Sequence, residues 1–396
     1  MVKRRQPFVG VTAFSQRTEH LRPEGAYAVL ARAQALEAQD RDIIHLEIGP
    51  PDFETYPHIV QAGIRAIEEG YTRYTPPAGM PSLREVIAES AGRQRGLTFD
   101  PGQVVVSPGA KPNLFFPTLA VVEEGDEVIY PDPGFPSYKA MIQVAGGIPV
   151  PVPLLEENGF SFDLDAFDRL ISDRTRLIIL NSPGNPTGGI LPVEDLEHIA
   201  AAAQKYDCWV LSDEIYTRII FDGQEADTIA GLPGMGERTI IMDGFSKTYA
   251  MTGWRLGYGI MPVDLAGKVG LLLTHSVGST AQFTQIAGIE ALQGDQQQVD
   301  EVVRTYQKRR DAIVSGLNSL PGISCQNPQG AFYVFPNIKT LGLSSQEAAD
   351  LFLDKAGVAT LPGSAFGKYG EGYLRLCYAN SLENIQLALE KMREVL

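Results

Sequence analysis

Short apolar runs recur along the middle of the sequence, and each is followed by a turn and then by a segment with helical spacing. The runs lie at residues 103–107, 127–130, 176–180, 208–213 and 239–242. Their aliphatic and β-branched composition predicts strands that are buried on both faces. Strands that alternate with helices form a mostly parallel sheet, and ligands bind such a sheet outside the carboxyl ends of its strands. The sequence therefore predicts an α/β fold with a binding site along one edge of the sheet.

The segments on either side of this region predict a second, smaller α+β unit. Helical spacing predicts helices of this unit at 299–317, 345–356 and 382–396 and another at 25–39 in the N-terminal segment, and apolar runs predict its strands at 43–48, 330–336 and 372–378. Further helices are predicted at 57–69 and 82–96, in the large domain. Ser82 is expected to cap its helix, with Glu85 completing a capping box. We expect the N-terminal segment to complete the small domain. The expected division is 1–56 for an N-terminal arm and part of the small domain, 57–296 for the large domain, and 297–396 for the C-terminal small domain.

The turn after the run at 239–242 carries Lys247, flanked by Ser246 and followed by Arg255. A lysine in such a turn is either an exposed charge or an amine whose pKa is lowered by burial and by a neighbouring guanidinium, so that it can attack a carbonyl group. The serine hydroxyl and the arginine fork together suit a phosphate group. An amine nucleophile beside a phosphate site indicates pyridoxal phosphate, bound as a Schiff base in the large domain.

Three other turns at predicted strand ends hold candidate site residues. The backbone N–H groups of Gly109, Ala110 and Lys111 precede a helix and can bind an anion, as in many α/β turns. Phe135, in a proline-bounded loop, either stacks on a flat ring or packs beneath the loop. Asn185 either donates to a phenolate-type oxygen or makes a structural Asx turn. Taken singly, none of these turns identifies a site.

Two charged residues stand at unusual places in apolar strands. Asp213 ends the run at 208–213, where a carboxylate is costly unless a cation meets it. It either pairs with a protonated pyridine nitrogen or caps the next turn. Tyr216 can donate to a ring oxygen nearby. Arg375 either makes a structural ion pair or binds an anion such as a substrate carboxylate. Because the central candidates all fall at strand ends, we favour a single cofactor site over separate structural roles.

Composition argues against several other classes of protein. The 33 basic and 48 acidic residues give a net charge of −15, which disfavours a nucleic-acid partner, and no apolar run reaches membrane-spanning length. Residues 1–7 read as a mobile arm and not as a secretory signal. Cys208, Cys325 and Cys377 form no close pair, so a reducing cytoplasm fits. The histidines lack metal-ligand spacing, the glycine motifs of nicotinamide and nucleoside-triphosphate sites are absent, and no metal is expected.

With these residues identified, the chain resembles the class I/II pyridoxal-phosphate aminotransferases of fold type I, the aspartate aminotransferase superfamily, over nearly its whole length. The resemblance implies a mostly parallel large-domain sheet of the seven-stranded type, a smaller α+β domain, and a homodimer with shared active sites. It is carried by Gly49-Pro-Pro-Asp-Phe, Tyr74-Thr-Pro-Pro-Ala-Gly, Asn185-Pro-Thr-Gly, Asp213-Glu-Ile-Tyr, Ser246-Lys-Thr-Tyr-Ala-Met-Thr-Gly-Trp-Arg and Tyr373-Leu-Arg-Leu.

The resemblance also implies a role for each candidate. Lys247 would be the Schiff-base lysine and proton shuttle, Asp213 would pair with the pyridine nitrogen, and Tyr216 and Asn185 would hold the ring oxygen. Phe135 would stack on the ring. Arg375 would bind the substrate α-carboxylate, with the backbone of Gly49 nearby. The phosphate would be bound by Ala110, Lys111, Ser246 and Arg255, joined by Tyr74 from a second subunit.

The implied activity is transfer of an amino group from an L-α-amino acid to a 2-oxo acid by a ping-pong mechanism. No basic residue in the sequence clearly supplies a second cation for a dicarboxylate, so a neutral or aromatic donor is favoured. Two alternatives remain open at this point: an α,β-elimination (C–S) lyase on the same fold, and a non-catalytic sensor of amino acids or pyridoxal phosphate. The sensor is disfavoured because no basic DNA-binding module precedes the fold.

Overall fold

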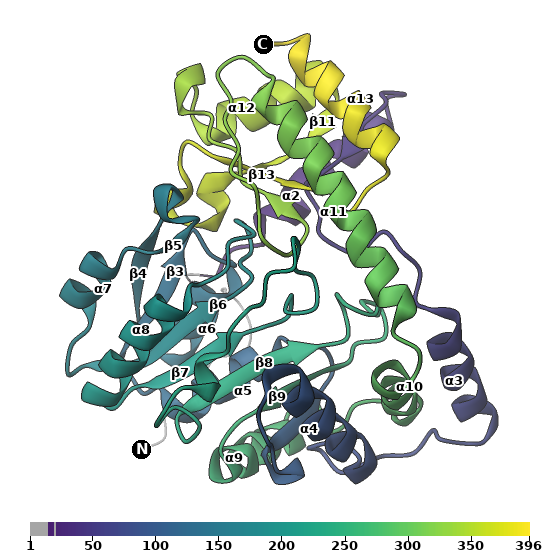
Figure 1. The fold of residues 1–396 in the computed structure, drawn as a ribbon, viewed down its shortest axis with the longest axis vertical. Helices are drawn as coiled ribbons and strands as arrows, with labels where there is room; N and C mark the ends of the chain where they lie inside the picture. The colour runs from purple at the N-terminus through teal and green to yellow at the C-terminus, as the bar shows by residue number, and fades with distance from the viewer. Residues whose placement is uncertain (1–14, 20) are drawn as a thin grey trace, which may run out of the picture.

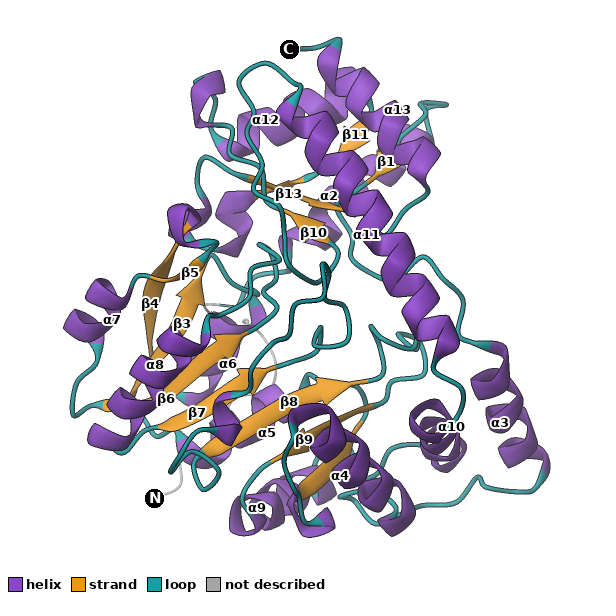
Figure 2. Cartoon of the chain, viewed as in Figure 1, coloured by secondary structure: helices purple, strands orange, loops and turns teal. Residues whose placement is uncertain are grey.

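The computed structural model describes residues 15–19 and 21–396 of the chain, and its central feature is an eight-stranded sheet (Figures 1 and 2). The strand order is β2-β9-β8-β7-β6-β3-β4-β5. The strands are β2 (Val104–Ser107), β3 (Glu127–Asp132), β4 (Ile148–Leu155), β5 (Ser161–Phe162), β6 (Thr175–Asn181), β7 (Trp209–Asp213), β8 (Thr239–Gly244) and β9 (Gly257–Ile260). The α/β fold with a mostly parallel sheet is thus confirmed.

Three strands of this sheet were not among the predicted ones. The β4 strand contains Pro149, Pro151 and Pro153, and it runs parallel to β3. Proline cannot donate to a ladder, so it is tolerated near an edge of a sheet. On its other side β4 pairs only with the two-residue β5. The β9 strand runs antiparallel to both β2 and β8, which leaves β2 parallel to β8. The seven-stranded type of sheet is therefore present, extended by β5.

Helices cover both faces of the sheet. Val105 faces a core cluster built with α5 (Pro112–Val121), α6 (Ser137–Ala145) and α9 (Val263–Thr274). Val104 and Val106 point the opposite way, toward α3 (Pro57–Glu68), α4 (Pro81–Arg95) and α10 (Gln282–Gln293). On that same face, α7 (Leu164–Leu170) and α8 (Val193–Lys205) cover β6 and β7. Neighbouring valines face opposite sides of the sheet, and helices bury both sides. These strands are therefore apolar at every position, and not only at every second one.

The expected cap of helix α4 is wrong. Met80 is the N-cap residue and makes no side-chain capping bond, and Pro81 occupies the first helical position. Proline suits that position because its missing N–H would have no partner there. Ser82 therefore lies inside the first turn. The C-terminus of this helix follows the usual rule, since Gly96 caps it with a left-handed conformation, φ 65°.

The smaller unit lies at the other end of the molecule (Figure 1). Its strands are β1 (Ile44–His45), β10 (Tyr333–Val334), β11 (Val358–Ala359), β12 (Leu361–Pro362) and β13 (Leu374–Cys377), and its helices are α2 (Gly25–Glu37), α11 (Gln297–Asn318), α12 (Ser345–Leu351) and α13 (Leu382–Arg393). The expected helix at 345–356 changes to a π-helix at Phe352–Ala356. The predicted strands at 43–48, 330–336 and 372–378 are shorter than expected.

The N-terminal segment joins this unit through backbone pairing. The β1 strand is parallel to β11, with Ile44 opposite Val358, and α2 packs against β11 and β12. These contacts support the expected composition of the small domain, and the boundaries at 56/57 and 296/297 stay a prediction. A four-residue helix, α1 (Gln16–Glu19), precedes α2. The arm predicted at 1–7 lies outside the described residues. In the described part of the chain, no helix is both long and apolar enough to cross a membrane.

Candidate active site

The carboxyl ends of the parallel strands meet along one edge of the sheet and line a cavity of about 650 Å³. Strand register places Asn181 beside Asp213, and Asp213 beside Met242. The predicted site residues that line the cavity are Gly49, Ala110, Lys111, Phe135, Asn185, Asp213, Tyr216, Ser246, Lys247, Arg255 and Arg375. Gly109 lies next to this lining, and Tyr74 lies outside it. The structure thus brings together residues that are far apart in the sequence.

Lys247 lies in the turn after β8 and is partly buried. Its Nζ donates to the carbonyl oxygen of Gly49 at 2.7 Å and lies over the rings of Phe332 (5.3 Å) and Tyr216 (5.8 Å). Burial, together with the charge of Arg375, lowers the pKa of Lys247 to about 8. The guanidinium that acts on this amine is that of Arg375 and not that of Arg255, which is nearer in the sequence. An amine with such a pKa is a usable nucleophile and base near neutral pH.

Asp213 is almost completely buried, with 3% of its surface exposed. Its Oδ2 accepts a hydrogen bond from the Tyr138 hydroxyl at 2.6 Å. Burial raises the pKa of Asp213 to about 7, although the bond from Tyr138 acts in the opposite direction. Among the described residues, no basic side chain lies within 4 Å of this carboxylate. The site therefore holds a buried acceptor that a cationic ring nitrogen would stabilise.

The turn after β2 and the guanidinium of Arg255 form an anion-binding cradle. Gly109 has φ +83°, and a side chain there would clash with the Arg255 guanidinium. Gly257 is equally restricted, since its Cβ would meet the backbone of Ala110. Arg255 bonds to the backbone oxygens of Thr252 (2.9 Å) and Pro108, and no carboxylate of the described residues pairs with it. The backbone N–H groups of the turn directly before helix α5 can add to this cradle, whereas Pro112, the first residue of the helix, has no N–H.

Arg375 lies on β13 and is 5% exposed. One terminal nitrogen donates to the carbonyl oxygen of Glu47, and the other donates to Asn185 Oδ1 at 3.2 Å. Its Nε is buried and has no hydrogen-bond partner among the described residues. No structural ion pair accounts for this arginine in the described chain, so of the two interpretations of its sequence the anion-binding one agrees with the geometry.

Tyr216 and Asn185 each keep a polar group available to the cavity. The Tyr216 hydroxyl lies 3.0 Å from the hydroxyl of Tyr333. Burial raises the pKa of Tyr216 well above its usual value, so this phenol stays protonated. The carbonyl of Asn185 accepts from Arg375, and its NH₂ group makes no hydrogen bond to a described residue. Both residues can therefore donate to an oxygen in the cavity.

Sequence reasoning missed several cavity residues. Tyr138, Asn181, Tyr333 and Glu24 all line the cavity. Asn181 ends β6, so its position at a strand end was a usable signal; its Nδ2 donates to the backbone of Asp213 at 3.0 Å. Glu24 accepts from Lys111 Nζ at 2.5 Å, and Lys111 also lies 5.1 Å from the Phe135 ring. No local sequence pattern indicates this pairing.

Tyr74 is 97% exposed, in the irregular loop between α3 and α4. Its hydroxyl cannot serve this cavity in a single chain. Its predicted role in a second subunit stays a prediction.

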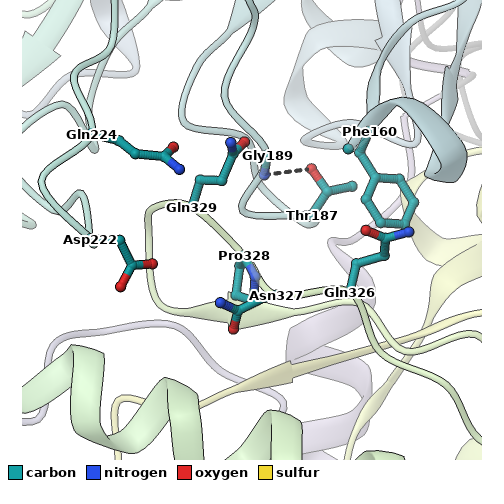
Figure 3. A pocket seen from close by; sticks show the side chains of 10 residues that line it. Phe160, Thr187, Gly189, Asp222, Gln224, Gln326, Asn327, Pro328 and Gln329 are labelled. Atoms are coloured by element: carbon teal, nitrogen blue, oxygen red, sulfur yellow. Dashed lines mark hydrogen bonds between the residues drawn. The ribbon is translucent and has the colours of Figure 1, made fainter.

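A second cavity, of about 290 Å³, has a different set of lining residues (Figure 3). It is lined by polar loops that include Asp222, Gln224 and Gln329. Gln329 bridges two of its walls, since its side chain accepts from the backbone of Ile190 at 3.0 Å. The polar groups of Asp222 are engaged by Arg310. None of the predicted site residues lines this cavity.

Behind the main cavity, Arg95 of α4 lies between two buried carboxylates. Its Nε donates to Glu214 at 2.6 Å and its Nη2 donates to Asp243 at 2.9 Å. Tyr258 donates to the same oxygen of Asp243, at 2.9 Å. Burial alone would lower the pKa of Arg95, but the two carboxylates raise it above its usual range. This cluster ties the end of β7 to the end of β8, directly before Lys247.

The cavity fits pyridoxal phosphate on its own chemistry. It offers an amine with a lowered pKa, a buried carboxylate without a cation, two donors for a ring oxygen, and a cradle where only glycine leaves room beside an arginine. Phe135 is partly buried at the same cavity and meets Tyr138 edge to face at 5.7 Å. No group of three or more His, Cys, Asp or Glu side chains suited to a metal occurs in residues 15–19 and 21–396.

Comparison with known proteins agrees with this geometry. The family model for aminotransferase class I and II matches residues 41–392. Aromatic-amino-acid aminotransferase 2 of Thermococcus litoralis is 40% identical, over 97% of this chain and 98% of its own, and an aspartate aminotransferase of Pyrococcus abyssi is 42% identical, over 90% and 92%. Aspartate aminotransferase from Thermus thermophilus with maleate superposes with a TM-score of 0.93 at 37% identity, covering 98% of this chain and 100% of that one. The chain belongs to the class I and II aminotransferases and is a pyridoxal-phosphate-dependent transaminase of fold type I.

Proposed function

We propose that this aminotransferase takes the amino group of a neutral or aromatic L-α-amino acid and passes it to a 2-oxo acid. The observation that carries the preference is the pairing of Lys111 with Glu24 at the cavity. The described lining holds four basic residues, Lys111, Lys247, Arg255 and Arg375. If the last three bind the cofactor and the α-carboxylate, only Lys111 remains for a second carboxylate, and Glu24 neutralises it.

The walls of the cavity support the same preference. Tyr27, Phe135 and Tyr333 contribute aromatic surface, and Leu30 and Ile48 contribute aliphatic surface. A buried carboxylate without a partner costs more than about 1–3 kcal/mol, and about 1.4 kcal/mol is a tenfold change in an equilibrium. The names of the relatives include both aromatic-amino-acid and aspartate aminotransferases, so they do not decide between the two classes.

When bound, pyridoxal phosphate supplies an electron-accepting ring that makes removal of a proton from the substrate α-carbon feasible. We assign Asp213 to hold positive charge at the ring nitrogen, and Tyr216 and Asn185 to donate to the ring oxygen. Phe135 would pack on the ring. The phosphate is assigned to the backbone N–H groups of Gly109, Ala110 and Lys111 and to the side chains of Ser246 and Arg255, with Tyr74 contributed by the partner subunit of a homodimer.

Lys247 and Arg375 act on the substrate. Arg375 binds the α-carboxylate, and the fixed carbonyls of Glu47 and Asn185 hold its guanidinium in place. Lys247 would hold the cofactor covalently through Nζ. As a free amine beside the carbonyl of Gly49, the same Nζ can take the proton from the substrate α-carbon.

A panel of amino acids tests the proposal. The purified holoenzyme is mixed with each amino acid in turn, and conversion to the amine form of the cofactor is followed by absorbance. Phenylalanine, tyrosine or a neutral aliphatic amino acid should react with a kcat/KM more than about tenfold above that of aspartate or glutamate. An aspartate value equal to or above the best neutral donor would refute the substrate preference. The panel also includes cysteine, which carries a sulfur leaving group on its β-carbon; its conversion to pyruvate, ammonia and sulfide without an oxo-acid acceptor would indicate elimination instead of transfer.

A further inference from the structure

Tyr333, which sequence reasoning did not identify, contacts three of the residues assigned to the reaction. It lies on β10, is 2% exposed, and lines the cavity. Its hydroxyl lies 3.0 Å from the hydroxyl of Tyr216 and donates to the carbonyl oxygen of Gly49 at 3.4 Å. The guanidinium of Arg375 lies over its ring, with Cζ 4.5 Å from the ring centre.

The aromatic ring of Tyr333 lies where a carboxylate counter-ion of Arg375 could otherwise stand. No carboxylate of the described residues pairs with that guanidinium, and its Nε has no hydrogen-bond partner among them. An aromatic face attracts a cation without neutralising its charge, and the attraction is largest where water is excluded. Arg375 is thus held in position while its charge stays available for an arriving carboxylate. A carboxylate in the place of Tyr333 would instead compete with the substrate.

The hydroxyl of Tyr333 has one proton and two acceptors within reach. In the present arrangement it donates to Gly49, whose carbonyl also accepts from Lys247. If Tyr216 donates to the ring oxygen of the cofactor, its own oxygen is free to accept, and Tyr333 can turn its proton toward it. A phenol that accepts a hydrogen bond becomes a stronger donor, because successive hydrogen bonds polarise one another.

The position of Tyr333 depends on the Gly49 turn. A Cβ atom at position 49 would clash with the Tyr333 hydroxyl and ring. The absence of a side chain at Gly49 therefore allows the hydroxyl to reach both the Gly49 carbonyl and Tyr216. The tyrosine also meets Tyr216 edge to face, with ring centres 5.9 Å apart and planes at 85°. These contacts leave the ring little freedom to turn.

We propose that Tyr333 is a positioning residue of the transamination site: its ring face holds Arg375 for the substrate carboxylate, and its hydroxyl sets the donor strength of Tyr216. The inference rests on the proposed function, because it uses the roles assigned there to Arg375 and Tyr216. The ring and the hydroxyl of Tyr333 then have separate effects, and each effect can be measured by itself. Removing the hydroxyl should change the cofactor environment, whereas removing the ring should also weaken carboxylate binding.

The test compares Tyr333→Phe and Tyr333→Leu with the wild-type holoenzyme, and uses Tyr378→Phe as a matched control. Tyr378 is a fully buried tyrosine whose hydroxyl donates to Ala331 at 3.1 Å, and it does not line the cavity. Two readouts are independent of turnover. One is the pH midpoint of the visible absorption change of the holoenzyme. The other is the dissociation constant of the desamino analogue of the best donor, which is 3-phenylpropionate if that donor is phenylalanine.

Tyr333→Phe should move the pH midpoint upward by about half a unit and leave the dissociation constant within about twofold of wild type. Tyr333→Leu should move the midpoint in the same direction and raise the dissociation constant about tenfold. Tyr378→Phe should change neither quantity. In a Tyr216→Phe background, Tyr333→Phe should produce no further shift, because its effect passes through the Tyr216 hydroxyl.

The role of the hydroxyl would be overturned if Tyr333→Phe left the pH midpoint unchanged. It would also be overturned if Tyr333→Phe shifted the midpoint equally in wild type and in the Tyr216→Phe background. Wild-type affinity in a folded Tyr333→Leu protein would overturn the ring role. Should the leucine variant fail to fold, Tyr333→Met, which also lacks an aromatic face, replaces it as the test of the ring role. Failure of the proposed function is recognised separately, since it would appear in the wild-type protein as no transamination of any donor.

Discussion

The hydroxyl of Tyr138, on α6, donates a 2.6 Å hydrogen bond to Asp213 at the end of β7, and both side chains are buried. Two neutral donors, this hydroxyl and the backbone N–H of Ile215 (3.3 Å), stabilise the carboxylate only in part, so burial still raises the pKa of Asp213 to about 7. The protein thus carries a carboxylate that is not fully compensated by its own residues. A cationic ring nitrogen would stabilise the negative charge of this carboxylate. Binding of the cofactor would therefore relieve the unfavourable free energy of the buried charge, and this relief would add to the affinity for the cofactor.

Asp213→Asn should stabilise the apoprotein at higher pH. The pKa of Asp213 is raised from 3.8 to about 7, so between these values the folded state binds more protons than the unfolded state, and this group lowers stability as pH rises. The variant has no carboxyl group to titrate at this position. Its free energy of unfolding should therefore rise relative to that of wild type by on the order of 3 kcal/mol between pH 4 and pH 8. Thermal unfolding midpoints of both apoproteins at several pH values measure it. A difference between Asp213→Asn and wild type that stays constant across the pH range would contradict the shifted pKa.

Lys247→Ala should keep pyridoxal phosphate only non-covalently. Borohydride reduction should attach the cofactor to the wild-type peptide that contains Lys247, and mass spectrometry of the variant should find no adduct. Turnover should fall by at least about a thousandfold, since both the covalent link and the proton carrier are lost. Lys268→Ala, on α9 and away from the cavity, serves as the control. An adduct on another residue, or normal turnover of the variant, would remove Lys247 from this role.

Glu24→Gln should shift the preference toward acidic donors. The change leaves the shape of the side chain but frees the charge of Lys111, which can then meet a second carboxylate. The kcat/KM for aspartate should rise several-fold relative to that for phenylalanine, and the double variant with Lys111→Gln should lose the gain. Steady-state kinetics on both donors measure the ratio. An unchanged ratio would show that the ion pair does not govern donor choice.

Arg95→Met should be strongly destabilising. Arg95 is buried between Glu214 and Asp243, and removing it leaves two carboxylates without their cation. Breaking a buried charge cluster in this way costs about 3–5 kcal/mol. The matched control is Arg93→Met on the same helix, because Arg93 is exposed and, among the described residues, its one ion pair is with Glu89; that change should stay within about 0.5 kcal/mol. Thermal unfolding of the two variants distinguishes them, and similar midpoints would mean that the cluster contributes little.

Mixing two inactive variants tests whether active sites are shared between subunits. Tyr74 is almost fully exposed in the single chain, and exposed apolar residues such as Ile64 and Ile67 lie on α3 nearby in the sequence. If a homodimer forms, unfolding and refolding Tyr74→Ala together with Lys247→Ala should restore about a quarter of the native sites, one in each hybrid dimer. Activity of the mixture after refolding is the measurement. Activity no greater than the sum of the separately refolded variants would place Tyr74 outside the neighbouring site.

Part of the fold and most of the candidate site followed from local sequence alone. The strands that include Val104–Ser107, Thr175–Asn181 and Thr239–Gly244 were predicted because their continuous apolar character is a local property. Nine of the eleven predicted site residues that line the cavity lie at the edge of the large sheet where its parallel strands end, whereas Gly49 and Arg375 come from the small unit. The proline-rich β4 was not predicted, since three prolines disfavour a strand unless the neighbouring edge is known to be open.

Sequence determined which residues carry chemical groups: the amine of Lys247, the carboxylate of Asp213 and the guanidinium of Arg375. Tertiary structure alone decided which neighbours act on them. It placed Tyr138 against Asp213, Tyr333 beneath Arg375 and Glu24 beside Lys111, in each case from a separate segment of the chain. The reason is physical: residue type and strand position depend on a few consecutive residues, whereas burial, charge pairing and the resulting pKa depend on contacts that exist only after distant elements have packed.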